Sequence, residues 1–170
     1  MTKEKEVTLK KFKIDRLRLE ASKSELIEMG KKQARKVPVD QLGKYKSVDR
    51  DVVDMIKTQE DTMIPELLPL RHQRMMANAF SFLRGTAEVM EYDLLHGVQS
   101  NIPVMICGDA HLNNFGFFAS PERQLLFGLN DFDETRVGNW ESDLKRLMVS
   151  TKLLGEINGY KDDHVHDILK

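Results

Sequence analysis

The chain has a single cysteine among its 170 residues, so a disulfide within one copy of the chain is excluded. A lone thiol is typical of proteins in a reducing compartment, and we expect a cytoplasmic location. No apolar stretch approaches the roughly 18 residues of a membrane span. The N-terminal residues also lack the apolar segment of a secretory signal. The sequence therefore favours a protein without a membrane partner.

Glycine-rich nucleotide motifs are also missing, since neither G-x-G-x-x-G nor a Walker-type segment occurs anywhere in the chain. Hydrophobic residues make up 41% and charged residues 31%, values that are ordinary for a globular protein. The length fits one domain. The absence of these motifs argues against nucleotide binding by this chain alone.

Positive charge is concentrated at the N-terminus although the net charge is only −1. Residues 1–46 hold 14 of the 26 Lys and Arg residues but only 7 of the 27 acidic residues. Nucleic-acid binding is one interpretation. Interleaved acids and few aromatic residues make a solvated helical arm the better one, and nucleic acid an improbable partner. We divide the chain into a basic arm, residues 1–25, and a domain, residues 26–170.

Hydrophobic periodicity predicts a mostly helical α+β fold with a small β-hairpin. A linker is expected over residues 37–48. On the last helix, Leu144, Leu147, Met148 and Thr151 recur at the spacing of one buried face. The expected helices cover residues 25–36, 49–61, 70–79, 85–96 and 143–156, and the expected strands are 103–107 and a hairpin over 115–129.

Polar residues follow two of these strands. Asp109, His111 and Asn114 come after the first strand, and Asp131 and Asp133 follow the hairpin. The hairpin should return Asp131 to the neighbourhood of Asn114. Amide and carboxylate oxygens suit Mg²⁺, or Mn²⁺, rather than zinc. A base Asp, a metal-binding Asn on the same loop and a later metal-binding Asp are what phosphoryl transfer requires.

Each of these residues also has a structural interpretation. Asp109 could cap a turn, and His111 could order a crowded loop. Asp133 is either a metal ligand or a loop acid. Arg84 could bind the phosphates of a cofactor, or form a salt bridge. Of the remaining charged residues, Arg71 and Arg74 are interpreted as surface or ion-pair residues, and Asp143 and Arg146 could pair on one helix.

The pattern Gly-Asp-x-His-x-x-Asn resembles the catalytic loop of aminoglycoside phosphotransferases and related small-molecule kinases. The resemblance implies that Asp109 is the catalytic base and that Asn114 and Asp131 bind the metal. His111 would order the loop, and Asp143 would brace it. A partial protein-kinase-like fold is implied with them.

A longer series of segments resembles the bacterial family called domain of unknown function 2252, over roughly residues 26–160. The segments are RMM, FSFLRG, CGDAHLNNFG, LNDFDE and WESDLKRL. Family members are usually longer and carry a Gly-rich segment and a Lys-bearing strand further on. The resemblance implies the N-terminal part of a Mg²⁺-dependent phosphotransferase, inactive alone, that uses ATP only if a downstream half is present. Its phosphoryl acceptor is unknown.

Two other functions stay open from the sequence. The chain could be a non-enzymatic product, or the partner-binding half of a split protein. A metal-dependent phosphoesterase is a weaker alternative, because the further Asp, Asn and His ligands of a two-metal centre are missing.

Overall fold

The computed structural model describes residues 21–170, in which helices predominate over two small sheets. The elements are α3 (Lys23–Lys36), α4 (Val39–Leu42), α5 (Val52–Glu60), η1 (Pro65–Leu67), α6 (Leu68–Met75), α7 (Ala79–Arg84), α8 (Ala87–His96), β1 (Pro103–Ile106), η2 (Leu112–Asn114), β2 (Phe115–Ala119), β3 (Leu125–Leu129), β4 (Arg136–Asn139), α9 (Trp140–Ile157) and α10 (Asp162–Ile168). The α+β prediction is confirmed. Residues 1–20, most of the expected basic arm, lie outside the described residues.

The helices begin and end largely where polar capping residues occur. Ser22 and Glu25 form a reciprocal capping box at the start of α3, which confirms the expected helix over residues 25–36. The helix predicted over 70–79 is confirmed only as far as Met75, where α6 ends. Asn78 then begins α7 by accepting a hydrogen bond from Ser81 N at 2.8 Å. The expected linker over 37–48 contains the short helix α4.

The two sheets are antiparallel pairs. The predicted hairpin is confirmed as β2–β3, in which Phe115 pairs with Leu129 and Ala119 with Leu125. Strand β1 pairs instead with β4, a strand that the sequence did not predict, from Pro103↔Asn139 to Ile106↔Arg136. Strand β4 lacks apolar alternation, and its Gly138 leaves the space that the Ile106 side chain fills. Pairing with β1 therefore defines β4 more than local propensity does.

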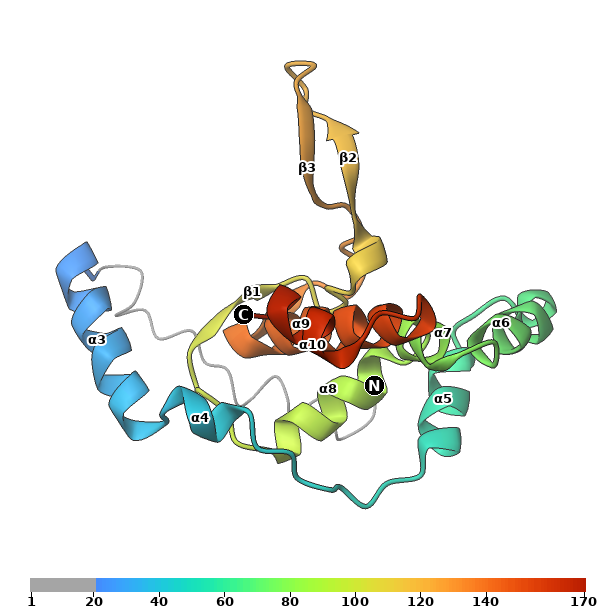
Figure 1. Cartoon of the computed structure of the whole chain (residues 1–170), viewed down its shortest axis with the longest axis horizontal. Coiled ribbons are helices and arrows are strands. Elements are labelled where there is room, and N and C mark those ends of the chain that lie inside the picture. Colours follow the sequence, from blue (N-terminus) through green and yellow to red (C-terminus); the bar gives the residue numbers. More distant parts are fainter. Residues whose placement is uncertain (1–20) are drawn as a thin grey trace.

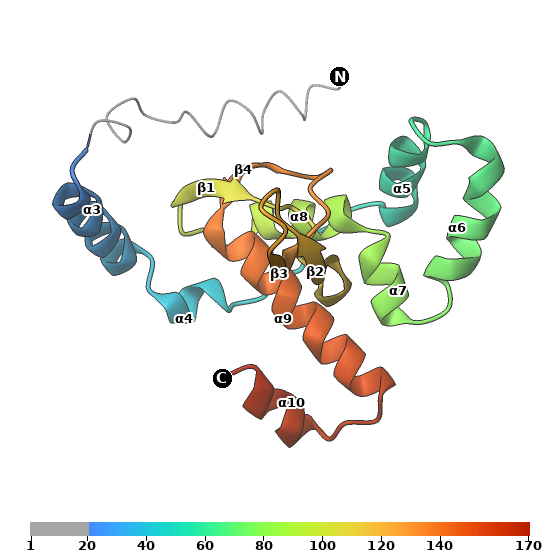
Figure 2. The ribbon, with the colours of Figure 1, turned by 90° about the horizontal axis from the view of Figure 1, so that it is seen from above.

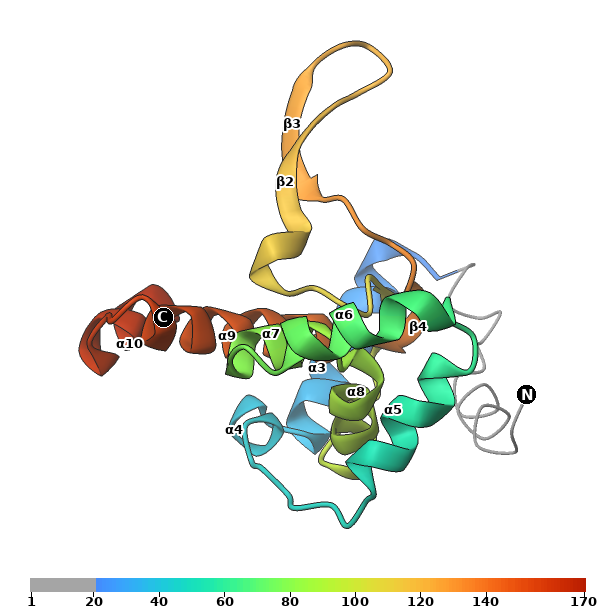
Figure 3. The same ribbon diagram turned by 90° about the vertical axis from the view of Figure 1, so that its right-hand side faces the viewer.

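Helix α9 lies at the centre of the described chain (Figure 1) and contacts β1, α7, α8, η2 and α10. Seen from above, α9 runs from the β1–β4 pair to α10, which lies beside its far end (Figure 2). The β2–β3 hairpin projects away from the helices in the first view and in the side view (Figure 3). Within residues 21–170, no helix has both the length and the apolar character needed to cross a membrane.

The predicted buried face of α9 is confirmed only in part, since Leu147 and Thr151 are half-buried. Leu144 and Met148 are exposed, whereas the buried residues of the helix are Glu141, Ser142, Arg146, Ser150 and Gly155. Helix α9 is buried through polar side chains because it packs against a loop whose backbone groups need hydrogen-bond partners. This polar face positions the candidate site.

Candidate functional site

The loop from Cys107 to Asn114 joins β1 to β2 and carries the first cluster of predicted site residues. Its turn depends on Gly108, whose φ of +87° lies in the left-handed region. A Cβ at this position would also overlap the carbonyl oxygen of Glu134. Cys107 is buried and its Sγ donates to the backbone oxygen of Asp131 at 3.1 Å, which ties the two predicted clusters together.

Three side chains of α9, spaced three and four residues apart on one helical face, hold this loop. The Asp143 carboxylate accepts hydrogen bonds from Cys107 N at 2.7 Å and Gly108 N at 2.9 Å, which confirms that Asp143 braces the loop. Arg146 pairs with Asp109, and Ser150 Oγ accepts from Leu112 N at 3.0 Å. We call Asp143, Arg146 and Ser150 the polar stripe of α9.

Asp109 is positioned by the most buried cation of the site. Arg146 Nε donates to Asp109 Oδ1, and Arg146 Nη2 donates to the Leu83 carbonyl at 2.7 Å. The predicted pairing of Arg146 with Asp143 is therefore wrong. Because Oδ1 is held by Arg146, Oδ2 is the oxygen of Asp109 that remains to accept a proton.

His111 lies beneath Asp109, with 2% of its surface exposed. Its Nε2 is 3.6 Å from Asp109 Oδ2, and the Phe80 ring meets it edge-on at a centroid separation of 6.1 Å. Burial lowers the pKa of His111; the charge of Asp109 opposes this shift, while Arg84 adds to it. The lowered pKa favours the neutral form of this buried imidazole.

Asn114 and Asp131 line the same cavity as Asp109 and His111. The register of the hairpin brings them together, since Asn130 N donates to the Asn114 carbonyl at 3.1 Å. Asn114 Nδ2 donates to the Asp109 carbonyl at 2.8 Å, so the side-chain oxygen is the atom left to bind a cation. The Asp131 carboxylate has no hydrogen bond or ion pair to another described residue. One amide oxygen and one carboxylate fit Mg²⁺, which usually takes few protein ligands.

Asp133 lies further out. It is exposed and lines a smaller neighbouring cavity of about 180 Å³, which Asp109 and Asp131 also border, but it does not line the main cavity. Burial raises the pKa of the neighbouring Glu134, and the charges of Glu88, Asp109 and Asp133 raise it further. The region beside Asp131 is therefore rich in negative charge.

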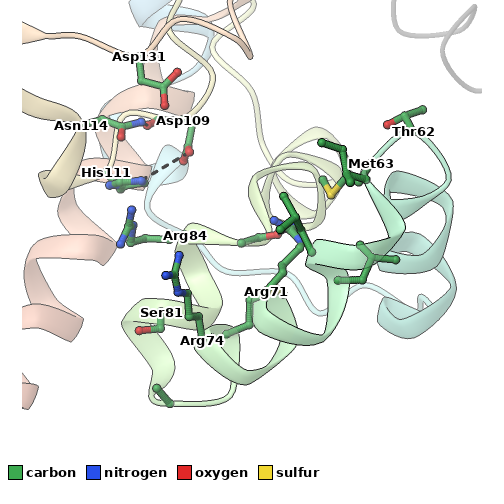
Figure 4. Close-up of a pocket in the computed structure, with 16 residues that line it drawn as sticks. Thr62, Met63, Arg71, Arg74, Ser81, Arg84, Asp109, His111, Asn114 and Asp131 are labelled. Carbon is green, nitrogen blue, oxygen red and sulfur yellow. Dashed lines mark hydrogen bonds and ion pairs between the residues drawn. The ribbon is translucent and has the colours of Figure 1, made fainter.

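Arg84 lines the main cavity, which has a volume of about 830 Å³, and also borders the smaller one, where Asp133 and Glu134 lie. The salt bridge considered from the sequence does not form with any acid among residues 21–170. Figure 4 shows Asp131 above Asn114 and Asp109, with His111 and then Arg84 below them. The cavity thus has an acidic side and a basic side.

Sequence reasoning missed Arg146 and Ser150 as residues that position the site. Their signal was the spacing Asp-x-x-Arg-x-x-x-Ser, which places three polar groups on one face of a helix. Leucines at neighbouring positions obscured that pattern. Residues 21–170 contain no group of three or more His, Cys, Asp or Glu side chains placed to hold a metal.

Comparison with known proteins identifies a family. The family model of domain of unknown function 2252, described as an uncharacterized protein conserved in bacteria, matches residues 63–170. Because this match covers more than half of the chain, the chain belongs to that family. Neither a curated protein nor a solved structure matches the chain.

Proposed function

We propose that this member of the family supplies the base and the metal ligands of a Mg²⁺-dependent phosphotransferase. The observation that carries the proposal is the convergence of Asp109, Asn114 and Asp131 on one cavity. They come from two loops and are joined through the bonds from Asn114 to Asp109 and from Cys107 to Asp131. The five-residue offset between Asp109 and Asn114 is also that of the kinase catalytic loop.

The proposed chemistry assigns one role to each residue. Asp109 Oδ2 accepts the proton of an acceptor hydroxyl, while Arg146 fixes the carboxylate through Oδ1. Asn114 and Asp131 would hold Mg²⁺, or Mn²⁺, which when bound neutralises charge on the phosphates. His111 fills the space beneath the base and keeps water away from it.

ATP is the proposed phosphoryl donor, with a small molecule or a protein as the acceptor. Phosphoryl transfer depends mainly on positioning and on electrostatic stabilisation of the phosphates. The 170 residues contain no Gly-rich segment that could surround a nucleotide. Other elements would have to supply it, so we expect weak nucleotide binding and negligible turnover by this chain alone.

Calorimetry with ATP, in the presence and absence of Mg²⁺, tests the proposal. We expect weak, Mg²⁺-dependent binding that Asp131→Asn and Asn114→Ala remove and that Asp109→Asn retains. Asp167→Asn is a matched control, because Asp167 is an exposed carboxylate of α10. Binding that needs no Mg²⁺, or that persists in Asp131→Asn, would contradict the proposal. The non-enzymatic alternative predicts no metal-dependent binding in any variant.

A further inference from the structure

Two arginines lie on the basic side of the main cavity. Arg74 is in the last turn of α6 and Arg84 in the last turn of α7, and both line the cavity together with Asp109 and His111. Both side chains are exposed, and neither makes an ion pair or a hydrogen bond to another residue in the described range 21–170. Their guanidinium donors are therefore available to a ligand.

A third arginine, Arg71, also lines the cavity, but its side chain is hydrogen-bonded to other residues of the fold. Its Nη2 donates to the Gly85 carbonyl at 2.6 Å and to Gln59 Oε1 at 3.2 Å. The bond to Gly85 ties α6, which carries Arg74, to the end of α7, which carries Arg84, and the bond to Gln59 ties α6 to α5. The bond to Gly85 thus holds together the two helix ends from which Arg74 and Arg84 extend.

Two neighbouring positive charges without acidic partners repel one another, and an anion between them would relieve the repulsion. Arginine also matches phosphate and carboxylate groups through paired N–H donors. The helix C-termini favour positive charge at these positions. That effect leaves the guanidinium donors free of hydrogen bonds, so it does not account for the fact that both residues line one cavity.

The position of the arginines indicates which part of a reaction they serve. In Figure 4, Asp131 lies on one side of Asp109, and Arg84 and Arg74 lie on the other. Nonpolar residues, Ile64, Leu67 and Leu68, line the same cavity. A ligand seated there would place an anionic group at the arginines, a hydroxyl at Asp109 and an apolar part against η1.

We propose that Arg74 and Arg84 form an anion subsite, and that the phosphoryl acceptor is a small molecule carrying a phosphate or carboxylate. The acceptor assignment rests on the proposed function, whereas the subsite itself does not. The cavity volume of about 830 Å³ is in the range of small-molecule sites.

Calorimetry in metal-free buffer tests the subsite with inorganic phosphate and phenyl phosphate as probes. We expect phenyl phosphate to bind more tightly, and Arg74→Gln and Arg84→Gln each to weaken both probes about tenfold, the loss of one charged hydrogen-bonding partner. Arg74→Lys should recover part of the affinity, because charge returns without the paired donors. Arg35→Gln, an exposed arginine of α3, is the matched control and should bind as the unmodified chain does.

Two further experiments distinguish the anion subsite from the proposed metal site. Asp131→Asn should leave phosphate binding unchanged, so failure of the metal site would not affect the subsite. Repeating the titration with saturating Mg²⁺-ATP assigns the anion: unchanged phenyl phosphate binding supports the acceptor, and competition overturns that assignment in favour of the donor's phosphates. Equal binding by Arg74→Gln, Arg84→Gln and Arg35→Gln, or no binding by any of them, would overturn the subsite.

Discussion

The loop between β1 and β2 and the hairpin that directly follows it are stabilised in opposite ways. Under the loop, polar side chains are buried: the exposed fraction is 2% for His111 and Arg146 and 0% for Ser150. On the hairpin, apolar side chains are exposed, with 71% for Phe117 and 63% for Phe127. The hairpin is held mainly by the pairing of β2 with β3, whereas the loop is held by side-chain hydrogen bonds from α9.

The difference shows where the fold requires a particular geometry. Buried polar groups are costly unless all their partners are in place, so a satisfied polar contact permits few alternative arrangements. The polar stripe of α9 therefore fixes the loop that carries Asp109 and Asn114. Exposed side chains on a projecting hairpin place little constraint on the rest of the molecule.

Replacing the buried cation should have the largest effect on stability. Arg146→Met leaves the Asp109 carboxylate without its partner, and we expect a loss of about 3 kcal/mol in the free energy of unfolding. Urea denaturation measures the loss. Arg35→Met, on the exposed face of α3, should change it by less than about 0.5 kcal/mol. Equal effects of the two substitutions would mean that Arg146 does not hold the loop.

Removing the charge of Asp143 should cause the next largest loss in the free energy of unfolding. In Asp143→Asn one oxygen still accepts a bond, but the new amide N–H₂ faces either Cys107 N–H or Gly108 N–H. We expect a loss of about 2 kcal/mol by urea denaturation, as for a hydrogen bond to a charged group. Asp167→Asn on α10 is the matched change, and a similar loss there would contradict the role of Asp143.

Ser150→Ala removes two neutral hydrogen bonds, the one accepted from Leu112 N and the one donated to the Leu147 carbonyl. Leu112 N would lose its acceptor, which should lower the free energy of unfolding by about 1 kcal/mol. Ser142→Ala is a control on the same helix, also buried but with no side-chain bond to the loop in the described chain. If the two variants unfold at the same urea concentration, the bond from Ser150 contributes nothing measurable.

Substitutions in the β2–β3 hairpin should reduce the stability of the protein least. Phe127→Thr keeps a strand-forming residue and loses only cross-strand contacts with Phe117 and Phe115, so we expect a loss of about 0.5 kcal/mol. Thermal unfolding compares it with Phe80→Leu, a core substitution expected to cost about 1.5 kcal/mol. A loss for Phe127→Thr above about 2 kcal/mol would show that the hairpin packs more extensively than its exposure indicates.

The sequence predicted the parts of the fold that depend on local signals. The strand at 103–107, the hairpin over 115–129 and the proximity of Asp131 to Asn114 follow from short apolar runs and a turn. Strand β4 and the break between α6 and α7 were missed. Strand β4 depends on a partner distant in the sequence, and the Asn78 cap lies within an otherwise helical pattern.

The sequence analysis named residues that share a cavity, but it missed two of the α9 residues that hold their loop, Arg146 and Ser150. Asp109, His111, Asn114, Asp131 and Arg84 border one cavity, although Asp133 does not. Arg146 was expected to pair with Asp143, its neighbour on the helix. Its actual partner, Asp109, is 37 residues away, a contact that only the packing of α9 against the loop creates.

The central claim is that Asn114 and Asp131 bind one divalent cation beside Asp109. Paramagnetic broadening of backbone amide signals by Mn²⁺ tests it most directly. The account predicts selective broadening at Asp109, Asn114 and Asp131, none at Arg123 in the hairpin turn, and its loss in Asp131→Asn. Broadening that survives in Asp131→Asn, or that is centred on other acidic residues, would contradict the account.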